Sequence, residues 1–193
     1  MNYLAHAYLS FGDPAITVGQ MIADFVKGKQ LFTYPADIQQ GIRMHRALDE
    51  FTDKHPATRR AKAIFQPSCG PYGGVFMDVI YDHYLANDAA RFTPASLKTF
   101  TAGIYALLED HRARLPPLFQ QVFAYMSRQN WLYGYREKNG IFQSISGIVR
   151  RAKYFNQPAD VPFGVFEAHY RTLGDCYREF FPDAHDFMRN RVR

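Results

Sequence analysis

The segment Gly74-Val-Phe-Met-Asp-Val-Ile-Tyr-Asp-His-Tyr-Leu-Ala86 decides the fold that the sequence predicts. It contains no Lys, Arg or Glu, and apolar side chains surround it on every side when it is wound as an α-helix. We therefore expect a buried helix at the centre of the protein. This helix nevertheless carries Asp78 and Asp82, four residues apart on one side, with His83 beside them.

Two carboxylates on a buried helix need compensation, because each unpaired one costs on the order of several kcal/mol. An Arg partner is the structural explanation. A divalent metal ion explains both carboxylates at once, and it accounts for the excess of Asp over Glu in the chain, 13 against 5. We favour the metal ion.

Helical periodicity continues on both sides of this segment, whereas hairpin turns and long alternating runs are nearly absent. The periodicity predicts helices at roughly residues 2–11, 14–28, 35–54, 56–66, 71–87, 94–110, 115–134, 139–155, 160–181 and 183–191. Several predicted starts carry a proline, whose missing N–H costs little there: Pro14, Pro35, Pro56, Pro94 and Pro182. We expect one compact all-α domain spanning residues 1–193.

The predicted helix 35–54 carries a second set of metal-ligand side chains. His45, Asp49 and Asp53 follow one another at intervals of four residues, on a line that borders the apolar face of the helix. A hydrogen-bonded surface row is the alternative for this helix taken alone. Together with the carboxylates of the buried helix, the row favours a metal site.

Asp24 and His6 extend the candidate site. Asp24 lies near the end of the predicted helix 14–28, where an acid opposes the helix dipole, so helix stability does not explain it. His6 lies in a short apolar helix, and we expect it to support a ligand rather than to bind the ion. Carboxylates and imidazoles without thiolates suit Mn²⁺, Mg²⁺ or Fe²⁺. The paired Glu-x-x-His motifs of di-iron bundles are absent, which favours hydrolysis over oxygen chemistry.

The amino-acid composition limits the classes of protein to which this chain can belong. The chain has 193 residues and a formal net charge of +5, and 47% of its residues are hydrophobic, as in a globular protein. No apolar run is long enough to span a membrane, and the start Met-Asn-Tyr-Leu-Ala-His lacks the features of a signal peptide. Cys69 and Cys176 are too few for a disulfide framework. We expect a cytoplasmic protein.

Positive charge is concentrated in the C-terminal part of the chain. Residues 1–111 carry a net charge of −1, whereas residues 112–193 carry +6. A docking face for an acidic partner is one interpretation, and a basic solvated surface is the other. No cluster of Lys and Arg or known motif favours nucleic acid.

Five motifs give the chain a close resemblance to the acyl carrier protein phosphodiesterases. They are Met1-Asn-Tyr-Leu-Ala-His6, Ala23-Asp-Phe-Val-Lys-Gly28, Gly41-Ile-Arg-Met-His-Arg46, Asp49-Glu-Phe-Thr-Asp-Lys-His55 and Asp78-Val-Ile-Tyr-Asp-His-Tyr-Leu85. The segments Trp131-Leu-Tyr-Gly-Tyr135 and Gly140-Ile-Phe142 fit the same family, so that the resemblance covers nearly the whole chain.

This resemblance implies a fold distantly related to the HD-type metallophosphohydrolases and an activity supported by Mn²⁺. It also implies the reaction, in which the phosphodiester between 4′-phosphopantetheine and a serine of holo-acyl carrier protein is hydrolysed. HD enzymes use a His-Asp doublet, whereas the buried helix carries Asp82-His83. The chain's His185-Asp186 doublet lies in a polar segment that we interpret as structural.

The chemistry of such a site suggests roles for its residues. The ion is expected to be held by some of Asp24, His45, Asp49, Asp78 and Asp82. His83 or His55 is expected to protonate the leaving serine oxygen. Asp53 is expected to orient one of these imidazoles. Asp24 is also expected to be a catalytic residue. The docking candidates for the acidic carrier protein are Arg136, Lys138, Arg150, Arg151 and Lys153.

Two other functions stay open at this stage. The metal cluster alone equally permits a phosphohydrolase acting on a nucleotide or another small phosphodiester. A non-catalytic helical binding module, with a salt-bridged cluster or a structural ion, is the third. The oligomeric state has no signal in the sequence.

Overall fold

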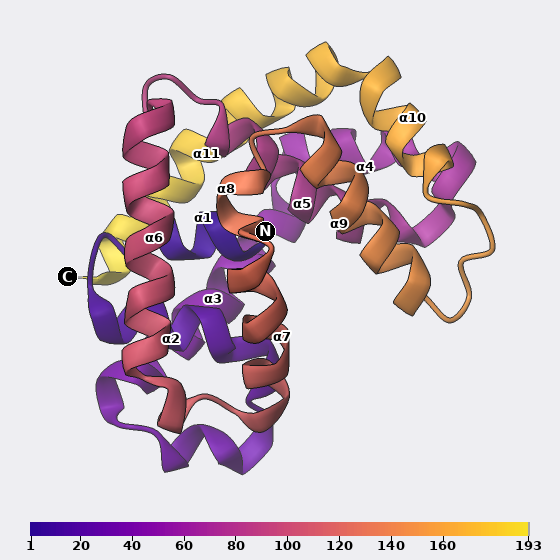
Figure 1. The fold of residues 1–193 in the computed structure, drawn as a ribbon. Coiled ribbons are helices and arrows are strands. Elements are labelled where there is room, and N and C mark those ends of the chain that lie inside the picture. Colours follow the sequence, from indigo (N-terminus) through magenta and orange to yellow (C-terminus); the bar gives the residue numbers. More distant parts are fainter. Residues whose placement is uncertain (193) are drawn as a thin grey trace.

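The computed structural model describes residues 1–192, and every regular element in that range is helical (Figure 1). The α-helices are α1 (Tyr3–Tyr8), α2 (Pro14–Ile22), α3 (Ala36–Lys54), α4 (Pro56–Cys69), α5 (Gly73–Ala86), α6 (Pro94–Asp110), α7 (Pro117–Arg128), α8 (Trp131–Gly134), α9 (Lys138–Arg151), α10 (Asp160–Ala168) and α11 (Tyr170–Val192). Four 3₁₀ turns join them: η1 (Ala23–Phe25), η2 (Gly28–Thr33), η3 (Gly70–Tyr72) and η4 (Arg112–Arg114). The predicted all-α class is confirmed. None of these helices has both the length and the apolar character needed to cross a membrane.

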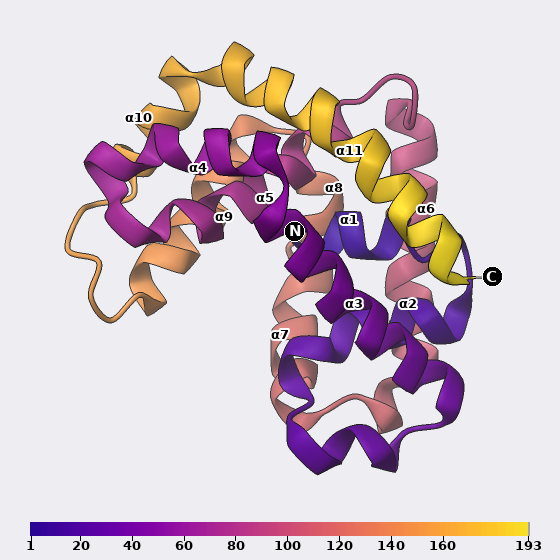
Figure 2. The same ribbon diagram turned by 180° about the vertical axis from the view of Figure 1, so that it is seen from behind.

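The helices form two arms that meet near the N-terminus (Figures 1 and 2). One arm contains α2, α3, α6 and α7, and the other contains α4, α5, α9 and α10. The long helix α11 packs on α3, α4 and α5, and so ties the two arms together. The short helix α1 lies at their junction, against both α2 and α5.

Two glycines allow α2 and α3 to pack with their backbones in contact. A Cβ atom on Gly19 would lie 2.3 Å from the carbonyl oxygen of Ile38, and one on Gly41 would lie 2.4 Å from that of Ile16. Any side chain at either position would force the helices apart. Because His45 follows Gly41 by four residues, this close crossing also sets how near His45 comes to the end of α2.

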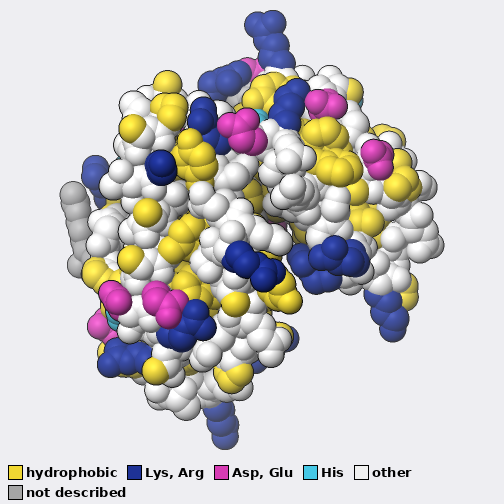
Figure 3. Space-filling view, in the orientation of Figure 1, with side chains coloured by type: hydrophobic (Ala, Val, Ile, Leu, Met, Phe, Trp, Pro, Cys, Tyr) yellow, Lys and Arg dark blue, Asp and Glu magenta, His cyan; other side chains and the backbone are white. Residues whose placement is uncertain are grey.

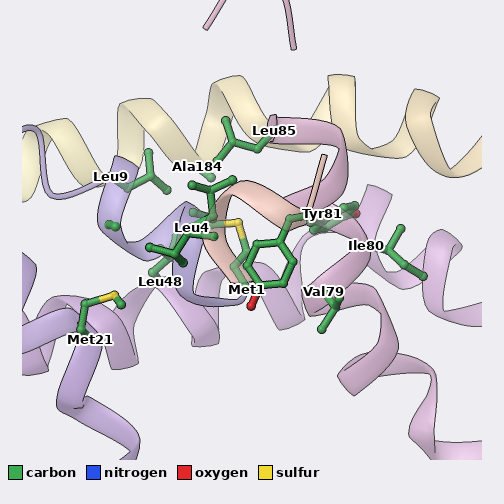
Figure 4. Close-up of a cluster of buried hydrophobic side chains, with 14 of the residues drawn as sticks. Met1, Leu4, Leu9, Met21, Leu48, Val79, Ile80, Tyr81, Leu85 and Ala184 are labelled. Atoms are coloured by element: carbon green, nitrogen blue, oxygen red, sulfur yellow. The ribbon is translucent and has the colours of Figure 1, made fainter. Parts of the chain in front are cut away.

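Helix α5 is the buried central helix that its composition predicted. Most of its residues from Phe76 to Ala86 are buried, and Phe76, Met77, Ile80 and Leu85 are completely inaccessible to solvent. Figure 4 shows Met1 and side chains of α1, α3, α5 and α11 meeting in this core, among them Leu4, Leu48, Tyr81, Leu85 and Ala184.

The buried carboxylate of Asp82 fixes α1 against this core. It accepts hydrogen bonds from the backbone N–H of Leu4 (2.8 Å) and of Ala5 (3.1 Å). These are N–H groups of the first turn of α1, which have no partner within that helix. One side chain of α5 thereby holds the N-terminal segment, and with it His6, in place.

Two predicted helices extend past breaks in the structure. Helix α2 ends at Ile22 rather than at residue 28, because the chain turns through η1 and reaches Gly28 with a positive φ of 54°. Asp24 thus lies in the turn and not in the last turn of a helix, which removes the argument from the helix dipole. The predicted helix 115–134 is divided at Asn130, whose left-handed conformation (φ 51°, ψ 52°) separates α7 from α8.

The prediction for Pro182 was also wrong. Pro182 does not begin a helix but lies inside α11, and the break in this region falls at His169 instead. Its neighbours Phe180, Phe181 and Ala184 are completely or almost completely buried. Packing of this face against the core offsets the backbone hydrogen bond that the proline lacks.

Candidate metal centre

Four elements bring acidic and imidazole side chains together at the junction of the two arms. His6 comes from α1, Asp24 from η1, His45 and Asp49 from α3, and Asp78 from α5. The imidazoles are buried, whereas the side chains of Asp24, Asp49 and Asp78 are 71%, 41% and 38% exposed. The carboxylates of the cluster are therefore open to an incoming molecule.

Asp49 lies at the centre of this cluster. Its Oδ1 atom is 3.2 Å from His6 Nε2, and its Oδ2 atom is 3.1 Å from His45 Nε2. His45 Nε2 also lies 3.3 Å from Asp24 Oδ1. His6, His45 and Asp49 each offer a ligand atom within 4.8 Å of the others, a spacing that suits a metal ion.

A hydrogen-bond chain fixes the tautomer of His6. The Ser10 hydroxyl donates to the carbonyl oxygen of His6, and the Gln20 side-chain amide donates to that hydroxyl. This leaves Gln20 Oε1 facing His6 Nδ1 at 3.0 Å, so that Nδ1 carries the proton. His6 Nε2 is buried without a hydrogen-bond partner, and its lone pair faces the Asp49 carboxylate.

This arrangement fits a cation. A lone pair and a carboxylate oxygen repel each other at 3.2 Å, and a positive ion that both can bind turns the repulsion into ligation. The second nitrogen of a metal-binding imidazole usually donates a hydrogen bond, as His6 Nδ1 does to Gln20. His45 differs, because its Nδ1 atom is buried without a partner.

The two imidazoles have opposite pKa shifts. Burial, and then the nearby charge of His45, lowers the pKa of His6 to about 4. Burial also opposes the charged form of His45, but the hydrogen bonds with Asp24 and Asp49 raise the pKa of His45 to about 9. Burial would raise the pKa of Asp49, yet its hydrogen bond with His45 and the charge of the Met1 ammonium group hold that pKa far below its usual range. Without an ion, the cluster thus keeps His45 protonated and His6 neutral at pH 7.

Asp78 is paired with the α-ammonium group of Met1. The Met1 nitrogen lies 3.1 Å from Asp78 Oδ1 and 3.3 Å from Asp49 Oδ1. Burial raises the pKa of Asp78, and this ammonium group opposes the rise. The structure therefore brings four of the five predicted metal ligands together, namely Asp24, His45, Asp49 and Asp78. The fifth, Asp82, uses both oxygens to accept the backbone hydrogen bonds of α1.

Three predicted catalytic residues have partners outside the cluster. Asp53 Oδ1 lies 2.6 Å from Lys62 Nζ, and His55 Nε2 lies 3.1 Å from Asp183 Oδ2. His83 contacts the carbonyl oxygen of Tyr135 and the hydroxyl of Tyr170, at 2.8 and 2.9 Å. The acid role of His55 or His83 and the orienting role of Asp53 stay predictions.

The five predicted docking residues divide into two groups. Lys138 is paired with Glu167 at 3.1 Å, and Arg136 lies 3.7 Å from Glu137. The other three are exposed at the end of α9 and just beyond it: Arg150, Arg151 and Lys153. Figure 3 shows Lys and Arg side chains on both sides of the hollow between the two arms.

Arg151 is the docking candidate that interacts electrostatically with Tyr3 of α1. Burial and the Asp24 carboxylate raise the pKa of Tyr3, and the Arg151 guanidinium opposes that rise. Arg151 and Asp24 are therefore each close enough to Tyr3 to interact electrostatically with it.

The sequence analysis gave His6 a supporting place and did not single out Gln20 or Lys62. His6 was expected to support a ligand, but it presents a buried, unpartnered nitrogen to Asp49. Gln20 lies in an apolar helix, and the 14 residues that separate it from His6 give no signal of their contact. Lys62 lies nine residues after Asp53, across a turn, so helical spacing does not connect them.

Comparison with known proteins agrees with the sequence motifs. Residues 1–184 match the family model described as acyl carrier protein phosphodiesterase. The chain is 33% identical to the acyl carrier protein phosphodiesterase of Photorhabdus laumondii, over 94% of this chain and 92% of that protein. It is 31% identical to the protein of the same name from Yersinia pestis and 30% identical to that from Salmonella dublin, each over 94% of both chains.

No solved structure matches the chain, so the expected relation to HD-type hydrolases stays a prediction. The family match covers the α1, α3 and α5 residues of the metal centre alike. The resemblance seen in the sequence is therefore confirmed, and the chain belongs to the acyl carrier protein phosphodiesterase family.

Proposed function

We propose that this protein is a metal-dependent phosphodiesterase of the cytoplasm that acts on holo-acyl carrier protein. Water cleaves the phosphodiester between 4′-phosphopantetheine and the carrier serine, and the products are apo-carrier protein and free 4′-phosphopantetheine. The family membership of the chain supports the substrate. The side chains at the junction of the arms support the metal requirement.

The contact between His6 and Asp49 carries the metal proposal. His6 is a neutral imidazole whose Nδ1–H donates a hydrogen bond to Gln20 Oε1, and its Nε2 lone pair points at a carboxylate oxygen of Asp49 3.2 Å away. Hydrogen bonding does not account for that geometry, because both atoms are acceptors. We propose His6, His45 and Asp49 as the residues that hold the ion, with Asp24 and Asp78 at its edge. Mn²⁺ is our first choice of ion, and Mg²⁺ or Fe²⁺ are alternatives with the same preference for oxygen and nitrogen ligands.

A divalent ion held by these residues would lower the pKa of a water molecule and offset the negative charge of the phosphoryl group. The side chains around it orient the reactants. Asp24 is the most exposed carboxylate of the cluster, and the hydrogen bond from His45 keeps its pKa below the usual range. It is therefore ionised at neutral pH and accepts a hydrogen bond, and then a proton, from the attacking water. The water oxygen bonds to phosphorus, the bond from phosphorus to the serine oxygen breaks, and the proton that Asp24 accepted passes to that leaving oxygen.

Charge complementarity supports the protein partner. Acyl carrier proteins are acidic, and residues 112–193 of this chain carry a net charge of +6. The exposed Arg150, Arg151 and Lys153 lie on the arm that carries Asp78. We propose that they receive the acidic face of the carrier protein while its prosthetic group reaches Asp24 and Asp49.

Intact-mass spectrometry tests this function directly. Holo-acyl carrier protein is incubated with the protein and Mn²⁺, and with EDTA in a parallel sample. We expect the carrier to lose the mass of 4′-phosphopantetheine with Mn²⁺ and to remain intact with EDTA. Bis-p-nitrophenyl phosphate, as a small phosphodiester, is assayed beside it.

Each other outcome has a defined meaning. Cleavage of the small diester with an unchanged carrier would replace the proposed substrate with a small phosphodiester. Full cleavage of the carrier in EDTA would refute the metal requirement. No turnover of either substrate by the folded, Mn²⁺-loaded protein would favour a binding module.

A further inference from the structure

Lys62 places a positive charge beside the carboxylates of the candidate metal centre. It projects from α4, and its Nζ atom lies 2.6 Å from Asp53 Oδ1 in the last turns of α3. Its side chain is only 27% exposed, whereas that of Lys54, which pairs with Glu50 on the same helix α3, is 67% exposed. Lys62 is therefore held between elements, and Lys54 is an ordinary surface residue.

Two glycines at the start of α5 make room for Lys62. A Cβ atom on Gly73 would lie 3.0 Å from the backbone carbonyl oxygen of Lys62. A Cβ atom on Gly74 would lie 3.3 Å from Lys62 Cε and 3.4 Å from its Nζ. The side chain of Lys62 thus lies directly over the backbone of α5 at Gly74.

This position puts the ammonium group next to the cluster on two sides. Gly74 precedes Asp78 by four residues, so that Lys62 Nζ lies one helical turn from Asp78 on the same face of α5. Asp53 likewise follows Asp49 by four residues on α3. Burial raises the pKa of Asp78, and the charges of the Met1 ammonium group and of Lys62 oppose that rise.

A phosphodiester is an anion, and three carboxylates at the centre of the site repel it. Catalysis of phosphoryl transfer depends on cations placed where negative charge develops on the phosphoryl oxygens. Lys62 offers a flexible point charge with three donors, of which its contact with Asp53 needs one.

We propose that the Lys62 ammonium group binds a non-bridging phosphoryl oxygen of the substrate, with Asp53 as the residue that positions it. This inference rests on the proposed function and extends it, because it assigns a substrate-binding residue on α4, outside the elements that hold the ion. It also gives Asp53 a role through Lys62 in place of the one expected through an imidazole.

Three variants separate this role from that of a surface ion pair. Lys62→Met removes the charge and keeps the length of the side chain, Lys62→Arg restores the charge, and Lys54→Met removes the matched surface lysine. Each is assayed with holo-acyl carrier protein and Mn²⁺. We expect Lys62→Met to lower kcat/KM by about 100-fold, mainly through kcat, Lys62→Arg to recover part of the loss, and Lys54→Met to stay within about twofold of wild type. Thermal unfolding of all three checks that the fold is intact.

A binding measurement tests the role of Lys62 without relying on turnover of the substrate. Inorganic phosphate is titrated into the Mn²⁺-loaded wild type and variants by calorimetry, and we expect Lys62→Met to weaken its binding by about tenfold or more. If wild type turns over the carrier but Lys62→Met matches Lys54→Met in both assays, the assignment of Lys62 is refuted and the proposed function stands. If wild type does not turn over the carrier, weaker phosphate binding by Lys62→Met alone supports the anion site. Phosphate binding that is absent, or equal in both lysine variants, refutes it.

Discussion

The imidazole rings of His6 and His45 stack face to face, with their centroids 3.8 Å apart and their planes inclined by 16°. Two protonated rings at this distance would repel each other strongly, so that the pair carries one positive charge. The carboxylates assign it to His45, whose pKa is raised to about 9 because Asp24 and Asp49 outweigh the effect of burial. His6, with a pKa lowered to about 4 by burial and by the charge of His45, stays neutral.

Metal binding should therefore release a proton from His45. Asp24 and Asp49, whose pKa values are lowered, are already ionised at pH 7, and His6 is already neutral, so we expect about one proton to be released for each ion bound. Titration calorimetry of Mn²⁺ binding at pH 7, in two buffers with different ionisation enthalpies, measures this number. Binding without proton release would show that His45 is not a ligand.

The same shift gives the metal-free protein a pH-dependent stability. The pKa of His45 is higher in the folded state than the ordinary value of 6.5, so its ion pairs contribute stability below about pH 6.5. This contribution is lost as the pH rises through about 9. In EDTA, the difference in Tm between wild type and His45→Gln should shrink between pH 6 and pH 9.5. A constant difference over that range would contradict the pairing.

The crossing of α2 and α3 at Gly41 should not tolerate the addition of a single methyl group. The Cβ atom in Gly41→Ala would lie 2.4 Å from the backbone carbonyl oxygen of Ile16, so α2 and α3 must separate. We expect a loss of about 2 kcal/mol in the free energy of unfolding, together with weaker Mn²⁺ binding. Gly103→Ala is the control, because its Cβ atom meets nothing within 4 Å on the exposed face of α6 and should stabilise by up to about 1 kcal/mol. Equal stabilities of the two variants in urea unfolding would refute the close crossing.

Removal of the Asp82 carboxylate should loosen α1. Asp82→Ala leaves two buried backbone N–H groups without acceptors, and we expect a loss of about 2 kcal/mol or more in the free energy of unfolding. Burial raises the pKa of Asp82 to about 7, in spite of those two hydrogen bonds. A raised pKa favours the folded state at low pH, so the stability gap between wild type and Asp82→Ala should narrow as the pH rises from 4 to 7. A gap that widens over this range would contradict the assignment.

Charge reversal at the end of α9 should slow the encounter with the carrier protein. Arg150→Glu combined with Arg151→Glu is expected to lower kcat/KM for holo-acyl carrier protein by about tenfold at low salt, with a smaller effect at high salt. Lys98→Glu combined with Arg171→Glu makes the same change of charge at exposed positions on α6 and α11. An equal effect of both double variants would assign the loss to net charge rather than to a docking face.

The sequence predicted the elements that carry strong periodicity and the residues that share one helix face. The buried character of α5 and the side-by-side placement of His45 and Asp49 follow from composition and from a spacing of four residues. The role of Asp82 does not follow in this way. A buried Asp calls for either a cation or hydrogen bonds, and the choice depends on α1, which docks from 77 or more residues away.

The contact between His6 and Asp49 could not be predicted, for the same physical reason. An isolated His in a short apolar helix is usually a buried, satisfied residue, and helical periodicity cannot show which side of α1 meets α3. The contact with Asp49 depends on the crossing at Gly19 and Gly41 and on the Asp82 hydrogen bonds together. Tertiary placement of this kind has no signature in the spacing of residues along the chain.

Binding of Mn²⁺ to single-site variants tests the central claim most directly. The free ion is quantified by electron paramagnetic resonance in titrations of wild type, His6→Ala, Asp49→Asn and His185→Ala, and carrier cleavage is followed by intact mass in the same samples. The account predicts that His6→Ala and Asp49→Asn each weaken Mn²⁺ binding at least about tenfold and slow the cleavage, and that His185→Ala matches wild type. Unchanged Mn²⁺ affinity in both His6→Ala and Asp49→Asn, or a loss of affinity confined to His185→Ala, would contradict it.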